Sequence, residues 1–113
     1  MNREIKFRGK HSNKWIYGYL LKNIDDNKCY ISVSLDQFYQ VKEETIGQYT
    51  GLKDKNGVEV YEGDLLKSYY EKPGIIKWND ELGAFQIKGI PSQTMKRCHE
   101  MEVIGNIYEN EVD

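Results

Sequence analysis

The sequence has few of the residues that build disulfide frameworks or membrane spans. It has two cysteines, Cys29 and Cys98, in 113 residues. That number is too small for a disulfide-stabilised fold and fits reduced thiols in a cytoplasmic protein. No apolar run approaches the length of a membrane-spanning helix, and the first residues lack the hydrophobic core of a signal peptide. We therefore expect a cytoplasmic protein that makes no membrane contact.

The sequence also lacks any group of residues arranged for catalysis or metal binding. Cys98 and His99 are adjacent, so on a strand they would point to opposite faces, and no Cys-x₂-Cys pair is present. Glu62 and Asp64 flank Gly63, where hydrogen bonding within a turn is favoured over acid–base chemistry. The glycines are not followed by the Lys-Ser/Thr of a phosphate loop. We predict no enzyme activity, no cofactor and no metal.

The charge is small overall and uneven along the chain. The net charge is -2, so no global field attracts nucleic acid, and we expect no nucleic-acid partner. Residues 1–57 hold ten Lys/Arg against seven Asp/Glu, whereas residues 58–113 hold six against eleven. Solvated strand faces explain this difference. Charge complementarity between neighbouring subunits is the other interpretation.

Hydrophobic residues recur with a period of two, which is typical of strands rather than helices. Residues 4–8, 14–21 and 28–35 alternate most clearly, and in the third segment the predicted inward positions are Cys29, Ile31, Val33 and Leu35. Short strands separated by turn residues continue to the end of the chain. The sequence predicts an all-β protein, with an N-terminal β-meander at residues 1–45 and a small SH3-like barrel at residues 46–113.

The strongest local signal is the turn Asp54-Lys-Asn-Gly57. Asn-Gly is the preferred pair where both central turn residues need positive φ, so we expect this conformation at Asn56 and Gly57. Residues 89–101 are irregular, with a short helix at 93–100 as one possibility. Further positions predicted to serve as structural turns or bends are Gly47, Gly51, Gly63, Asp64 and Gly105.

Aromatic residues provide the candidate interaction surface. Trp15, Tyr17 and Tyr19 would share one face of a strand, where they could pack within the protein, form a subunit interface or bind a ligand. Tyr70 and Trp78 form a second aromatic cluster, with lysines nearby, on the predicted barrel.

Blocks of sequence at both ends and in the middle resemble the YopX family, small proteins encoded mainly by phages and prophages of Gram-positive bacteria. The blocks are residues 3–9, 15–20, 45–57, 60–64 and 102–110. The resemblance has blocks at both ends and in the middle and so spans nearly the whole chain, with one departure at residues 92–101, which match no motif. It implies a mainly β, self-associating protein of unassigned molecular function, and it brings no catalytic residues.

The sequence therefore predicts a phage-encoded, non-enzymatic homo-oligomer that acts as an interaction or accessory factor. Its expected partner is a second copy of itself, with a phage or host protein as a further possibility. The alternative is a small nucleic-acid-binding module that uses the N-terminal aromatic strand or the aromatic face of the barrel. The net acidic charge of the C-terminal half argues against this alternative, because a nucleic-acid face normally carries a basic stripe.

Overall fold

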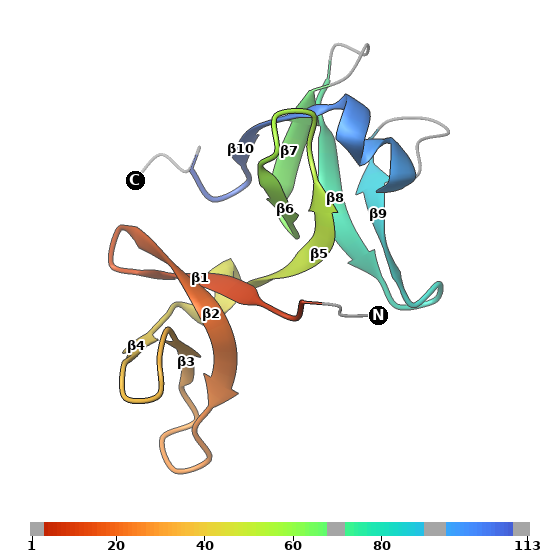
Figure 1. The fold of residues 1–113 in the computed structure, drawn as a ribbon. Coiled ribbons are helices and arrows are strands. Elements are labelled where there is room, and N and C mark those ends of the chain that lie inside the picture. Colours follow the sequence, from red (N-terminus) through yellow and green to blue (C-terminus); the bar gives the residue numbers. More distant parts are fainter. Residues whose placement is uncertain (1–3, 68–71, 90–94, 110–113) are drawn as a thin grey trace. The chain divides into compact units, whose positions relative to one another are not determined.

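The computed structural model describes residues 4–67, 72–89 and 95–109. These residues form an all-β fold of antiparallel strands, as the alternation predicted (Figure 1). Within the described ranges no helix is long and apolar enough to cross a bilayer. The strands are β1 (Phe7–His11), β2 (Lys14–Lys22), β3 (Cys29–Ser32), β4 (Phe38–Gln40), β5 (Gly47–Lys53), β6 (Glu59–Tyr61), β7 (Asp64–Lys67), β8 (Gly74–Asn79), β9 (Ala84–Lys88) and β10 (Glu102–Asn106), and the two 3-10 segments are η1 (Glu43–Thr45) and η2 (Met95–Glu100).

The chain divides into two compact units, residues 1–49 and 50–113. The division lies within β5, slightly beyond the boundary at residue 45 that the sequence suggested. In the first unit the strand order is β4-β3-β2-β1, and the start of β5 pairs with β1. The rest of β5 neighbours β6, and the second unit also contains a four-stranded sheet in the order β10-β7-β8-β9. The SH3-like description of this unit remains a prediction.

Strand β2 is shared by two partners. Residues 14–18 pair with β1, and residues 19–22 pair with β3. At the change of partner, Gly18 lies so close to β3 that a Cβ atom there would collide with the carbonyl oxygen of Ser32. Any side chain at this position would push the strands apart, so the close approach requires glycine.

The core of the first unit lies on one face of this sheet. Buried Cys29, Ile31 and Val41 form its centre, and Phe7, Ile16, Leu20 and Ile46 pack against them. Two predicted inward positions are wrong, because Val33 and Leu35 are exposed. Strand β3 ends at Ser32, and the Val33 N–H donates to the carbonyl of Gln37 in a tight turn. The chain therefore leaves the sheet before these two side chains could enter the core.

The core of the second unit is formed by Val60, Leu66, Ile76, Ile87, Cys98 and Met101. The four-stranded sheet supplies Leu66, Ile76 and Ile87 from one of its faces, while Cys98 comes from η2. The short helix considered for residues 93–100 is thus a 3-10 segment at 95–100. Strand β10 ends at Asn106, and its pairing with β7 shifts between Val103 and Gly105.

The β5–β6 turn is organised around the carboxylate of Asp54, which is only 5% exposed. Its Oδ1 accepts hydrogen bonds from the N–H groups of Asn56 and Val58, and its Oδ2 accepts one from Val103. The Gly57 N–H closes the turn on the Asp54 carbonyl. Gly57 has a φ of 81°, whereas positive φ at Asn56, expected from the sequence, is wrong. The pattern is that of a three-residue hairpin loop with glycine in the left-handed position.

Replacing Gly57 with valine should lower the free energy of unfolding by about 1–3 kcal/mol. A Cβ at Gly57 would meet no atom within 4 Å, so the loss comes from backbone conformation and not from a clash. Chemical denaturation of Gly57→Val beside Asn56→Val measures it, because position 56 accepts the same side chain without positive φ. Equal midpoints for the two variants would contradict the assigned turn.

Replacing Asp54 with asparagine should destabilise the protein by about 2–4 kcal/mol. The amide has one acceptor oxygen, so its NH₂ group must face either the Val103 N–H or the two turn N–H groups, which are then left without an acceptor. The exposed Asp25→Asn is the matched control. A denaturation midpoint for Asp54→Asn equal to that of the control would show that these hydrogen bonds contribute little.

The same carboxylate makes stability depend on acid pH. Burial favours the protonated form, but the N–H groups of Val103, Val58 and Asn56 outweigh it and hold the pKa of Asp54 below its ordinary value of 3.8. Because the folded pKa is the lower one, this stabilisation is complete above about 3.8 and is lost as the pH falls through the folded value. As the pH falls below 4, the free energy of unfolding should therefore decrease less in the Asp54→Asn variant than in the original protein.

Candidate interaction surface

The outer face of β2 carries a row of large side chains. Alternation along the strand turns Ile16 and Leu20 to the core, and places Trp15, Tyr17 and Tyr19 on the opposite face, as predicted. Leu21 continues the row. Tyr17 is 46% exposed, Tyr19 68% and Leu21 47%. The sequence left three roles open for this row, namely packing within the protein, a subunit interface and ligand binding. Tyr17 and Tyr19 are not core residues of the first unit, so a subunit interface and ligand binding are the roles left for these two side chains.

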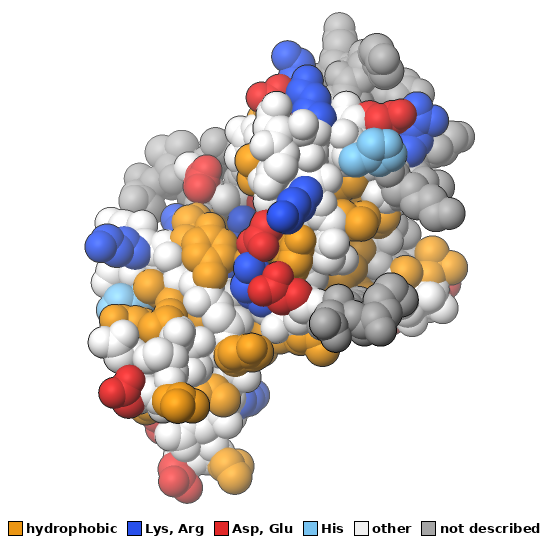
Figure 2. Space-filling view, viewed as in Figure 1, with side chains coloured by type: hydrophobic (Ala, Val, Ile, Leu, Met, Phe, Trp, Pro, Cys, Tyr) orange, Lys and Arg blue, Asp and Glu red, His pale blue; other side chains and the backbone are white. Residues whose placement is uncertain are grey.

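Neighbouring strands extend this row into a surface. The register places Ser32 beside Tyr19 and Phe38 beside Ser32, while Tyr30 lies beside Leu21. Phe38 is 56% exposed, and its ring meets that of Tyr30 edge-on at 5.8 Å. We name Tyr17, Tyr19, Leu21, Tyr30 and Phe38 the aromatic sheet face. Figure 2 shows several hydrophobic side chains at the surface of the part that Figure 1 draws in red to yellow.

Two cations border the aromatic sheet face. Arg8 pairs with Tyr17, and Lys10 pairs with Trp15, across β1 and β2. The Arg8 guanidinium lies 4.5 Å from the centre of the Trp15 ring, and the Lys10 ammonium lies 5.4 Å from it. Arg8 is buried and Trp15 partly buried. Trp15 therefore acts as a cation–π platform at one end of the row and is less available as an anchor than Tyr19 or Phe38.

The second predicted cluster is only partly described. Tyr70 lies outside the described residues, and Trp78 belongs to β8 in the second unit. The indole N–H of Trp78 donates to Asp80 at 2.8 Å, and its ring meets that of Phe85 edge-on at 5.0 Å. Although Trp78 remains partly exposed, both its ring and its polar atom have fixed neighbours.

The residues predicted to form turns or bends have different structural positions. Gly63 has a φ of 94°, and Asp64 is buried with its carboxylate accepting the Tyr61 N–H at 2.8 Å. The Asp64 carboxylate thus binds the backbone of the segment that precedes it. Gly51 also has positive φ, and Gly105 lies at the shifted pairing of β10. Gly47 marks no turn, because it lies within β5 opposite Arg8.

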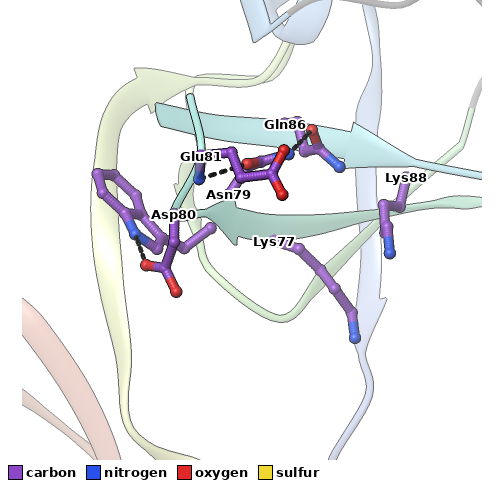
Figure 3. A pocket seen from close by; sticks show the side chains of 7 residues that line it. Lys77, Asn79, Asp80, Glu81, Gln86 and Lys88 are labelled. Atoms are coloured by element: carbon purple, nitrogen blue, oxygen red, sulfur yellow. Dashed lines mark hydrogen bonds between the residues drawn. The ribbon is translucent and has the colours of Figure 1, made fainter. Parts of the chain in front are cut away.

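A hollow of about 340 Å³ lies on the β8–β9 hairpin of the second unit (Figure 3). Its lining residues are Lys77, Trp78, Asn79, Asp80, Glu81, Gln86 and Lys88. Sequence analysis missed Gln86 and Lys88 here, because only the strand register brings them beside Lys77. For the same reason it missed Tyr30 and Phe38 on the aromatic sheet face, whereas the alternation along β2 could have revealed Leu21.

The titratable groups give no sign of a reactive centre in the part of the chain that the structure describes. No three His, Cys, Asp or Glu side chains there are placed to hold a metal ion. Burial, together with the negative charges of Asp54 and Asp64, raises the pKa of the Cys98 thiol to about 11. At neutral pH Cys98 is therefore protonated, which is the opposite of what a nucleophilic cysteine needs.

The comparisons place this two-unit, all-β chain among known proteins. The YopX protein family model matches residues 6–112. The crystal structure of protein EF1440 from Enterococcus faecalis is similar in fold, with a TM-score of 0.56, 25% sequence identity and 96% of each chain covered. The search of curated proteins finds no match. The chain belongs to the YopX protein family, as the resemblance indicated.

Cys98 should react with a thiol reagent at least 100-fold more slowly in the native protein than after denaturation, because a pKa near 11 leaves few thiolates at pH 8. The Cys29→Ala variant isolates this thiol for the measurement. Rapid modification of the native protein would contradict the protected position of this thiol.

The same thiol should make stability depend on alkaline pH. The folded pKa of Cys98 lies above the ordinary value of 9.0, so the free energy of unfolding should be constant below about pH 9 and fall as the pH rises towards 11.

Proposed function

We propose that this protein is a phage-encoded, non-enzymatic interaction factor that works as a homo-oligomer in the cytoplasm of the host cell. The observation that supports this most directly is the aromatic sheet face. It offers large apolar side chains to a partner, and the described residues contain no activated constellation that would suggest catalysis.

The size of the aromatic sheet face fits the centre of a protein interface. Aromatic side chains bury roughly 150–250 Å² each when covered. With its members about half exposed, the face leaves on the order of 400–500 Å² for a partner. A standard interface buries about 800 Å² on each side, with an apolar centre and a polar rim. The aromatic sheet face can therefore supply the apolar centre of such an interface.

The charge distribution favours a second copy as the occupant. Residues 1–49, which carry the face, hold eight Lys/Arg against six Asp/Glu, whereas residues 50–113 hold eight against twelve. Opposite net charges on the two units allow the basic first unit of one copy to meet the acidic second unit of another. Nucleic acid fits the face less well, because Arg8 and Lys10 lie over Trp15 and are already engaged.

The protein should form a stable oligomer at micromolar concentration, and the double variant Tyr19→Ser/Phe38→Ser should shift it to smaller species. Each substitution removes an exposed ring from the centre of the face while leaving the core residues Ile31 and Val41 in place. Sedimentation velocity at 5–100 μM, a range chosen to bracket ordinary specific interfaces, measures the mass.

The matched control is Leu82→Ser, which removes a 70% exposed apolar side chain from the β8–β9 hairpin. It should leave the oligomer unchanged, and a circular dichroism spectrum should show that all variants remain folded. A monodisperse monomer of the original protein at 100 μM would contradict self-association. Loss of assembly in Leu82→Ser, but not in the double variant, would place the interface elsewhere.

A further inference from the structure

The hollow on the β8–β9 hairpin is built from a single hairpin within the second unit. Strand pairing decides which side chains share its face. Lys77 lies opposite Gln86, and Lys88 lies opposite Ile75, two residues before Lys77. Directly opposed and diagonal positions of this kind fall on the same face of an antiparallel pair, within reach of long side chains. Figure 3 shows Lys77 and Lys88 extending on the same side of the hairpin.

Neither Lys77 nor Lys88 forms an ion pair with a residue that the structure describes. Asp80, the nearest acid in sequence to Lys77, accepts the Trp78 indole N–H at 2.8 Å. The hollow therefore holds two lysines on the sheet face and two carboxylates in the hairpin loop, of which Asp80 accepts from the indole and Glu81 does not.

The amide groups between the lysines have a fixed orientation. Asn79 Oδ1 accepts the backbone N–H groups of Glu81 and Leu82 at 2.9 and 3.1 Å. Its Nδ2 must then point the other way, and it donates to Gln86 Oε1 at 2.9 Å. This bond turns the NH₂ group of Gln86 away from Asn79. Gln86 therefore offers hydrogen-bond donors on the face that also carries Lys77 and Lys88.

We propose that this hollow binds the phosphate group of a small phosphorylated ligand. Lys77, Lys88 and the Gln86 NH₂ group have no acceptor among the residues that the structure describes, which suits a doubly charged oxyanion whose oxygens only accept. The volume of about 340 Å³ is near the lower end of ligand pockets, and exceeds what phosphate alone would fill. The Glu81 carboxylate, which also lines the hollow, is placed to accept from a hydroxyl group of such a ligand.

The surroundings favour a compact ligand over a nucleic-acid strand. A strand would carry further phosphates past Glu81 and across a unit that holds twelve Asp/Glu against eight Lys/Arg. Those phosphates would be repelled, and the described residues of the hollow offer only one pair of cations to compensate. The proposal is independent of the aromatic sheet face, since no residue is shared.

The test is a titration of the ¹⁵N-labelled protein followed by NMR at low ionic strength. The probes are inorganic phosphate, adenosine 5′-monophosphate, adenosine, acetate and a 12-nucleotide single strand. Inorganic phosphate should shift the amides of Lys77, Gln86 and Lys88 and the Gln86 side-chain NH₂ with a Kd of about 1 mM, and the monophosphate should bind more tightly. Adenosine and acetate should not shift these signals.

Variants of the lining residues distinguish phosphate binding in this hollow from non-specific attraction to exposed lysines. Lys77→Gln and Lys88→Gln should each weaken phosphate binding about fivefold, and Gln86→Glu should abolish it. Lys67→Gln, which removes an exposed lysine from β7 outside the hollow, should leave the Kd unchanged. Absence of shifts at 20 mM phosphate, an equal response to acetate, or tighter binding of the single strand than of the monophosphate would each overturn the proposal.

Discussion

The carboxylate of Asp54 is the contact on which the second unit depends most. It is almost fully buried, so its charge is tolerable only because three backbone N–H groups donate to it. Two of these belong to its own turn, and the third, from Val103, lies 49 residues further along the chain. The neighbouring Lys55 N–H adds a bond to the Met101 carbonyl. One side chain thus shapes the β5–β6 loop and fixes the start of β10 against it.

The two surfaces are formed by different means. The aromatic sheet face exists because β2 changes partner at Gly18, which lets β3 and β4 continue the sheet and place Tyr30 and Phe38 beyond Leu21 and Tyr19. The hollow on β8–β9 requires only one hairpin and a chain of oriented amides. The first surface offers area, and the second offers a few directed donors. Molecules with different chemistry can therefore occupy each of them.

Period-two alternation predicted the all-β class, the placement of Tyr17 and Tyr19 on the strand face opposite Ile16 and Leu20, and the inward positions of Cys29 and Ile31. It failed at Val33 and Leu35 because alternation does not reveal where a strand leaves its sheet. The loop of Gly57 was recognised, but Asn56 was assigned the wrong conformation because the Asp54 carboxylate, and not the Asn-Gly pair, sets the turn. Cross-strand neighbours such as Phe38 and Lys88 depend on register, which one sequence leaves undetermined.

The division of the chain inside β5 has a consequence for dissecting the protein. Gly47 and Gln48 pair with β1, and the later residues of the same strand neighbour β6. A fragment that ends at Tyr49 would cut β5 off shortly after the residues that pair with β1, and a fragment that begins at Thr50 would start in the middle of the strand that neighbours β6. An expression fragment of either unit should therefore retain all of residues 47–53, so that useful fragments overlap in sequence.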